Sequence, residues 1–205
     1  PINLEIHAKR ASRSLPLISR PLKKVSHPVL KVGPSPLRGG HKTNKKINRK
    51  YNLRIAMVPN GLVIREAREE DLPHVLNIEY KCFPDPYPLD LLHRLRATYP
   101  DTFLVAELHG KIIGYLIGAL KWLNTGHILA IGVDPAFWRK GVGSELMREV
   151  TRRLRVKGAK LIRLEVRKSN FRAQNFYRKL GFIERFEIPF YYGDGETAIA
   201  MEKRL

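Results

Sequence analysis

A loop of basic residues and glycines at 137–144 constrains this chain more than any other feature. Its sequence, FWRKGVGS, lies between an apolar stretch expected to form a strand and a helix expected at 145–157. Because Gly141 and Gly143 lack side chains, backbone N–H groups can approach an anion there, and the helix N-terminus adds a positive dipole end. The loop therefore predicts a site for a phosphate-bearing ligand, and a simple turn eased by glycine is the alternative.

Two common phosphate-binding motifs do not fit this loop. A nucleotide P-loop needs a longer glycine spacing that ends in Gly-Lys-Ser/Thr, which is absent here. The dinucleotide fingerprint G-x-G-x-x-G would need a glycine where Leu146 stands. The loop is therefore neither a nucleotide-hydrolase motif nor a dinucleotide-binding motif.

The composition excludes several other classes of protein. Hydrophobic residues make up 43% of the 205 residues, which is enough for a core, and no apolar run reaches the length of a membrane span. The single cysteine, Cys82, excludes an intramolecular disulfide and a cysteine-based metal site, and we expect no metal. One cysteine is consistent with a reducing compartment, so we expect a cytoplasmic protein.

The positive charge is concentrated in the first 56 residues. This segment carries 14 of the 38 Lys and Arg residues and one acid, Glu5, within a net charge of +19 for the chain. It contains several prolines and sustains no apolar period, so we expect a flexible basic arm at 1–56 and a domain at 57–205. Three explanations stay open: the arm contacts RNA or the ribosome, is a solvated tail, or is translated upstream of a natural start at Met57.

From residue 57 onward, strand and helix patterns alternate, which predicts an α/β fold. The expected strands are 62–64, 103–108, 112–120, 126–133, 161–166, 182–186 and 197–201. The expected helices are 69–82, 89–98, 145–157 and 171–180. A tight turn at 109–111 should join two antiparallel strands, and prolines at 84–88 should separate the first two helices.

An acidic residue near the end of one strand is a candidate for chemistry. Alternation along 161–166 places Leu161, Arg163 and Glu165 on one face and Ile162, Leu164 and Val166 on the other. A carboxylate at the C-terminal end of a central strand lies where open α/β sheets usually carry their sites. A structural ion pair of Glu165 with Arg163 or Arg167 is the alternative.

Several motifs together resemble the GNAT acetyltransferases, over about residues 62–202. The phosphate loop follows Val-Asp-Pro at 133–135, and the later sequence LEVRKSN at 164–170 precedes Phe-Tyr at 176–177. The segments FPDPYP at 83–88 and YYGDGE at 191–196 complete the likeness. More narrowly, the chain resembles the protein N-terminal acetyltransferases of the ribosomal-protein-alanine and archaeal types. The resemblance implies a mixed, mostly antiparallel sheet of about seven strands with about four flanking helices.

The resemblance also implies a binding site for acetyl-CoA, the acetyl donor. The backbone of Ile131, Gly132 and Val133 should pair with the pantetheine arm, and Asn170 should hydrogen-bond it. The pyrophosphate should bind at Arg139, Lys140, Gly141, Val142, Gly143 and Ser144. Trp138 departs from the family, which usually has Gln or Arg there, and this weakens at most one side-chain contact.

The catalytic and acceptor residues are implied in the same way. Glu165 matches the family's general base and Tyr177 the general acid, with direct transfer in a ternary complex. Two loops should flank the acceptor, a protein N-terminus, through Phe83, Pro84, Tyr87, Tyr191 and Tyr192. His127 could be a second base, but a structural or solvent role is the favoured interpretation, and Cys82 is expected to be an idle thiol.

Two other functions stay open at this point. The same fold could transfer the acetyl group to a lysine or a small amine. A protein of another class, a non-catalytic adaptor that binds RNA or ribosomes, would also fit the basic arm. The intact set of Glu165, Asn170 and Tyr177 favours the enzyme.

Overall fold

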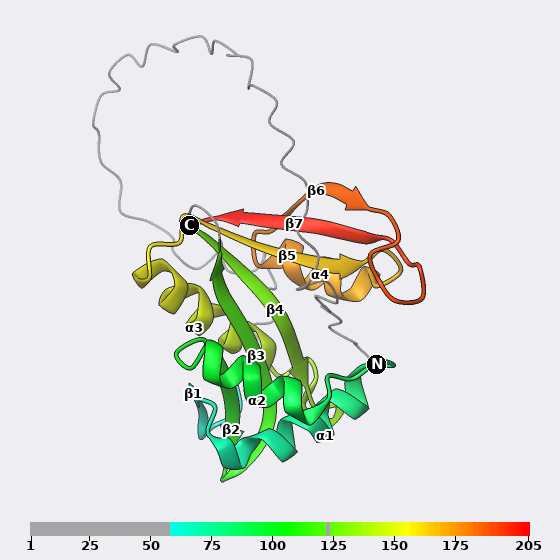
Figure 1. The fold of residues 1–205 in the computed structure, drawn as a ribbon. Coiled ribbons are helices and arrows are strands. Elements are labelled where there is room, and N and C mark those ends of the chain that lie inside the picture. Colours follow the sequence, from blue (N-terminus) through cyan, green and yellow to red (C-terminus); the bar gives the residue numbers. More distant parts are fainter. Residues whose placement is uncertain (1–57, 122–123) are drawn as a thin grey trace, which may run out of the picture. The chain divides into compact units, whose positions relative to one another are not determined.

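The computed structural model describes residues 58–121 and 124–205 (Figure 1). The basic arm expected at 1–56 lies outside the described residues. These residues form a seven-stranded sheet in the order β1-β2-β3-β4-β5-β7-β6. The strands are β1 (Leu62–Glu66), β2 (Phe103–Leu108), β3 (Lys111–Lys121), β4 (Thr125–Val133), β5 (Leu161–Arg167), β6 (Ile183–Ile188) and β7 (Ala198–Arg204).

Four α-helices cover the two faces of the sheet. They are α1 (Leu72–Cys82), α2 (Leu89–Thr98), α3 (Val142–Val156) and α4 (Phe171–Lys179), with short 3-10 turns η2 (Glu69–Asp71) and η3 (Pro135–Phe137). One apolar cluster joins α1 and α2 to the sheet, and a second cluster joins α3 and α4 to it. The sheet is therefore the middle layer of three, which is how an α/β fold buries both faces of its strands.

The third helix begins earlier than its sequence pattern predicts. We expected it to start at residue 145, but α3 starts at Val142, with Gly141 as its N-cap in the left-handed conformation at φ 79°. Glycine adopts this conformation without steric cost, so the helix can begin directly behind it. As a result, Gly143 and Ser144 belong to the first turn of α3 and not to the loop before it.

The two central strands β4 and β5 are parallel and stay together over a short distance. In the described sheet they pair at Thr125↔Leu161, Gly126↔Ile162 and His127↔Arg163. Every other neighbouring pair in the sheet is antiparallel. Figure 1 shows β4 and β5 diverging from this common end. The divergence opens the sheet in its middle.

A bulge in β4 accompanies this divergence. The register with β3 shifts between Ile117 and Gly118, which pair with Ala130 and Ile128, so Leu129 is the extra residue. A bulge bends a strand and increases its local twist. The bend turns β4 away from β5 just beyond the point where the two strands stop pairing.

Close packing of α3 on the sheet depends on glycine at position 118. A Cβ built there would lie 2.7 Å from Cγ2 of Val150 on α3. We expect Gly118→Ala to lower the free energy of unfolding by about 1–3 kcal/mol, because overpacking forces neighbours to move. Chemical denaturation of Gly118→Ala, Val150→Ala and the double variant tests this. The double variant should lose less than the sum of the single losses, and strict additivity would contradict the contact.

Candidate active site

The predicted phosphate loop is a cradle of backbone N–H groups at the start of α3. Arg139 and Gly141 both have left-handed backbone, with φ of 63° and 79°. The first hydrogen bond of the helix is from the Glu145 N–H to the Gly141 carbonyl, at 3.1 Å. The N–H groups of the three preceding residues have no acceptor within the helix, as in any helix N-terminus. They are well suited to an anion, together with the positive end of the helix dipole.

The end of β4 leads directly into this cradle. Some of its backbone groups point toward the opening between β4 and β5. The Asp134 N–H donates to the Ile113 carbonyl on β3 at 2.8 Å. Because successive residues of a strand alternate in direction, the backbone groups of Ile131 and Val133 point away from β3. Among the described strands, β5 no longer pairs with β4 at this level. This stretch can accept an extended ligand as an added strand.

Trp138, which departs from the family pattern, anchors the end of β4. Its Nε1 donates to the Val133 carbonyl at 2.6 Å, and the Cys82 thiol donates to the same oxygen at 3.3 Å. Cys82 is buried, and burial raises the pKa of its thiol to about 12. A thiol that stays protonated is a poor nucleophile, which agrees with the expectation that Cys82 is idle.

Glu165 lies on β5 beside the point where the strands part. It is 3% exposed, and its carboxylate accepts from His127 Nε2 at 2.5 Å and from Arg163 Nε at 3.0 Å. Burial would raise the pKa of this carboxyl, but the hydrogen bond from His127 and the charge of Arg163 outweigh it and hold the pKa below its usual value. The ion pair with Arg163 that the sequence left open is present. The carboxylate is therefore charged and acts poorly as a base by itself.

His127 has one ring nitrogen that the structure leaves without a partner. Nε2 meets Glu165, while Nδ1 is buried and has no hydrogen-bond partner among the described residues. If Nε2 carries the proton toward the carboxylate, Nδ1 holds a lone pair. A carboxylate that orients an imidazole in this way is a common arrangement for proton transfer near neutral pH.

Tyr177 lies on α4, in the apolar cluster on the other face of the sheet. Its ring packs edge-on against Phe176 and Phe182, with centroids 5.2 and 5.9 Å away. The hydroxyl is buried and has no hydrogen-bond partner among the described residues, and burial raises its pKa well above the usual value. A buried orphan hydroxyl is costly unless a ligand completes it. Asn170, at the start of the same helix, caps it by accepting from the Ala173 N–H at 3.0 Å.

Two aromatic loops converge near Glu165. Phe83 and Tyr87 are buried in the loop between α1 and α2, whereas Pro84 is exposed. Tyr191 lies in the loop between β6 and β7, where burial raises its pKa, and the nearby Glu165 and Tyr87 raise it further. One residue of each expected acceptor loop, Tyr87 and Tyr191, therefore influences the other electrostatically.

Arg167 fixes the loop between β6 and β7. Its guanidinium lies 4.0 Å from the ring centroid of Tyr192 and donates to Asp194 at 2.7 Å and Glu196 at 2.8 Å. Arg167 is at the end of β5 and 7% exposed, so the contacts are partly shielded from water. The loop is thus tied to the strand that carries Glu165.

One residue of this region was missed by the sequence analysis. In the helix expected at 69–82, Glu79 is fully buried, whereas its neighbour Tyr80 is 67% exposed. The buried positions Leu72, Val75, Glu79 and Cys82 follow a helical spacing of three and four residues. This spacing could have indicated that position 79 is buried, but an acidic residue is not expected at a buried position.

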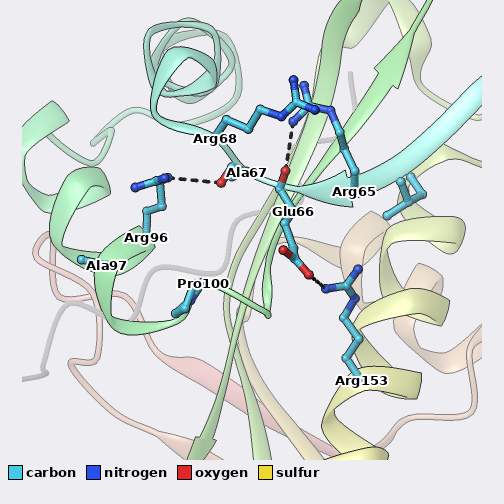
Figure 2. Close-up of a pocket in the computed structure, with 9 residues that line it drawn as sticks. Arg65, Glu66, Ala67, Arg68, Arg96, Ala97, Pro100 and Arg153 are labelled. Carbon is cyan, nitrogen blue, oxygen red and sulfur yellow. Dashed lines mark hydrogen bonds and ion pairs between the residues drawn. The ribbon is translucent and has the colours of Figure 1, made fainter.

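A surface hollow of about 520 Å³ lies away from these groups, between β1, α2 and α3 (Figure 2). Four arginines line it: Arg65, Arg68, Arg96 and Arg153. Each of them forms an ion pair with an acidic side chain. The charges are therefore balanced within the protein, and we assign no ligand to this hollow.

No group of three or more His, Cys, Asp or Glu residues in the described ranges could hold a metal ion. No helix within 58–121 or 124–205 is both long enough and apolar enough to span a membrane.

Comparisons with known proteins agree with this geometry. The family model described as the acetyltransferase (GNAT) family matches residues 72–182, so the chain belongs to the GNAT acetyltransferase family. The expected fold, a seven-stranded mixed sheet with four helices, is confirmed. Members of this family use acetyl-CoA.

The similar proteins narrow the class further. An uncharacterized N-acetyltransferase of Methanocaldococcus jannaschii is 37% identical over 144 residues, which cover 70% of this chain and 92% of that protein. An N-alpha-acetyltransferase of Sulfurisphaera tokodaii is 33% identical over 150 residues, with coverages of 67% and 90%. The crystal structure of Ard1 from Thermoplasma volcanium matches with a TM-score of 0.68 at 32% identity, over 71% of this chain and 98% of that one.

Burial of Glu79 predicts a pH-dependent stability. Burial raises the pKa of this carboxyl to about 8 from 4.5, so between these values the folded chain holds a proton that the unfolded chain releases. Stability should therefore fall as the pH rises from about 5 to 8, relative to Glu79→Gln, by a few kcal/mol in total. Denaturation at several pH values measures the difference. Glu70→Gln, an exposed control, should show no such trend, and parallel curves for wild type and Glu79→Gln would contradict the burial.

Proposed function

We propose that this protein is an N-terminal α-amino acetyltransferase that transfers the acetyl group of acetyl-CoA to protein N-termini. The observation that carries the proposal is the buried His127–Glu165 pair at the opening between β4 and β5, with one unpartnered ring nitrogen among the described residues. The N-alpha-acetyltransferase relatives at 30% identity or more support the same reaction.

The donor would be held mainly by backbone groups. The first turn of α3, together with Arg139 and Lys140, suits the pyrophosphate, and the edge of β4 at 131–133 that faces away from β3 suits the amides of the pantetheine arm. Asn170, the N-cap of α4, would hydrogen-bond the pantetheine arm. Acetyl-CoA supplies an activated acetyl group, whose bond to sulfur breaks as a bond to the acceptor nitrogen forms.

His127 and Glu165 would prepare the acceptor amine. The carboxylate of Glu165 holds Nε2–H of His127, so Nδ1 takes the proton that the amine loses. This refines the expectation that Glu165 is itself the general base, because its lowered pKa makes it better suited to orient and balance an imidazolium. Arg163 donates to the other carboxylate oxygen and keeps Glu165 charged whether His127 is neutral or protonated.

Tyr177 would protonate the departing thiolate. Its hydroxyl has a raised pKa and therefore retains its proton until a strong base appears beside it. A thiolate formed in the apolar surroundings of Tyr177 is such a base, since burial also disfavours its charge. The orphan hydroxyl fits this role, because the donor's sulfur would then be its first hydrogen-bond partner.

The His127–Glu165 pair suits an α-amine acceptor better than a lysine acceptor. An α-amine has a pKa near 8, whereas a lysine amine near 10.4 costs about 3.4 kcal/mol more to deprotonate at a given pH. A modest base such as a His–Glu pair is sufficient for the α-amine. The loop that Arg167 ties down would also narrow the approach to the site from that side.

Acetyl transfer to defined peptides tests the proposal. The full chain should acetylate peptides with free Ser, Ala, Met or Glu N-termini, and should not acetylate the same peptides with a blocked N-terminus and a free internal Lys. His127→Asn, Glu165→Gln and Tyr177→Phe should each lower kcat at least about 100-fold, as expected for loss of acid–base groups.

Matched substitutions at exposed positions control for folding. His74→Asn, Glu70→Gln and Tyr80→Phe change the same residue types at the protein surface and should retain activity. Acetylation of the blocked lysine peptides would overturn the proposal in favour of a lysine acetyltransferase. Donor binding without transfer to any peptide would instead indicate a small-amine acceptor or a non-catalytic protein.

A further inference from the structure

Glu79 is an ionisable residue in an apolar position. It lies in the last turn of α1 and is fully buried in the stripe that packs on the sheet. Burying a carboxyl among apolar side chains costs free energy unless its oxygens find donors. The residue therefore has a local task that an apolar side chain could not perform.

Glu79 holds both ends of the loop that follows α1. Its main-chain carbonyl accepts from the Phe83 N–H at 2.9 Å, which ends the helix. Its side-chain Oε2 accepts from the Tyr87 N–H at 2.6 Å, eight residues further along. One residue thus fixes the first and the fifth positions of the segment 83–87.

The sequence of this loop explains why a side-chain acceptor is needed. Prolines at 84, 86 and 88 remove three backbone N–H groups and restrict the residues before them. Tyr87 lies between two of these prolines and is 5% exposed, so its N–H must find an acceptor inside the protein. The carboxyl of Glu79 is that acceptor.

The loop is connected to the reacting groups through Tyr87. Tyr87 belongs to the apolar cluster that also contains Leu129 and Ala130 of β4, the strand that carries His127. The raised pKa of Tyr191, to which Glu165 and Tyr87 both contribute, agrees with this placement. A change at Glu79 should therefore alter the acceptor side of the site and leave the proposed donor-binding segment at 139–144 unchanged.

We propose that Glu79 is the positioning residue for the acceptor peptide: it fixes the loop 83–88 so that Phe83 and Tyr87 hold the peptide's first residues beside His127 and Glu165. The inference rests on the proposed function, because it takes this loop as the acceptor side. Glu79 itself does not touch the reacting atoms.

A glutamine should replace Glu79 with little loss. Burial keeps the carboxyl largely protonated at neutral pH, so its hydrogen bond to Tyr87 is one between uncharged groups. The amide oxygen of glutamine can accept from the same N–H at the same reach. A leucine has a similar volume but leaves the Tyr87 N–H buried without an acceptor.

Steady-state kinetics of Glu79→Leu and Glu79→Gln in the full chain test the inference. In Glu79→Leu, the KM for the acceptor peptide should rise about tenfold or more, the effect of losing one buried hydrogen bond, while the KM for acetyl-CoA changes less than about twofold. Glu79→Gln should restore the acceptor KM to within about threefold of wild type. Glu70→Leu, at an exposed site before α1, should change neither constant.

Three results would overturn the inference. These are an unchanged acceptor KM in Glu79→Leu, an equal rise in both KM values, and a glutamine variant as impaired as the leucine variant. Hydrogen exchange separates failure of this inference from failure of the proposed function, because it needs no acceptor. The amide of Tyr87 should be protected in wild type and Glu79→Gln and exchange faster in Glu79→Leu, even if no peptide is acetylated.

Discussion

The divergence of β4 from β5 is the constraint on which the site depends. A sheet normally satisfies each backbone group with a neighbouring strand, and here the described pairing stops after His127. The bulge at Leu129 turns β4 away, so the backbone of Ile131 and the N–H of Val133 face no described strand on that side, while the Val133 carbonyl accepts from Trp138 and Cys82. The opening ends at the first turn of α3, which offers N–H groups to an anion. A long acetyl donor that carries amides and phosphates would suit both parts: its amides would pair with the backbone of β4, and its phosphates would bind the N–H groups of α3.

Two buried carboxyls in this region, Glu165 and Glu79, differ in protonation state because their surroundings differ. Glu165 faces His127 and Arg163 and remains charged, whereas Glu79 faces a single backbone N–H and is held largely neutral. The same functional group therefore forms a charged pair with an imidazole in one place, which the proposed function uses for proton transfer, and a neutral hydrogen bond in the other. Polar neighbours, more than depth of burial, decide which state each carboxyl adopts.

The sequence predicted most of the fold because its elements are marked by local signals. Prolines at 84–88 and the turn at 109–111 separate elements cleanly, and apolar periodicity gave all seven strands and four helices. The motif residues Glu165 and Tyr177 could be named from the resemblance, and their roles stay predictions. The pairing of Glu165 with His127 could not be predicted from the sequence, because the two residues are 38 positions apart and only the pairing of β4 with β5 brings them together. Glu79 was missed because an acidic residue is not expected at a buried position of the helical spacing, and its partner, the backbone N–H of Tyr87, cannot be identified from residue types.

The outer strand β6 also has a consequence for how the protein behaves in concentrated solution. It is an edge of the described sheet, and it exposes Ile183 and Phe186, a combination that invites strand addition by another chain. However, its register shifts between Glu184 and Phe186, so Arg185 bulges and interrupts the regular row of backbone groups. The bulge and its charged neighbours make this edge a poor template for aggregation. The β6 edge thus resists self-association, although the described sheet also leaves β4 and β5 unpaired with each other beyond His127.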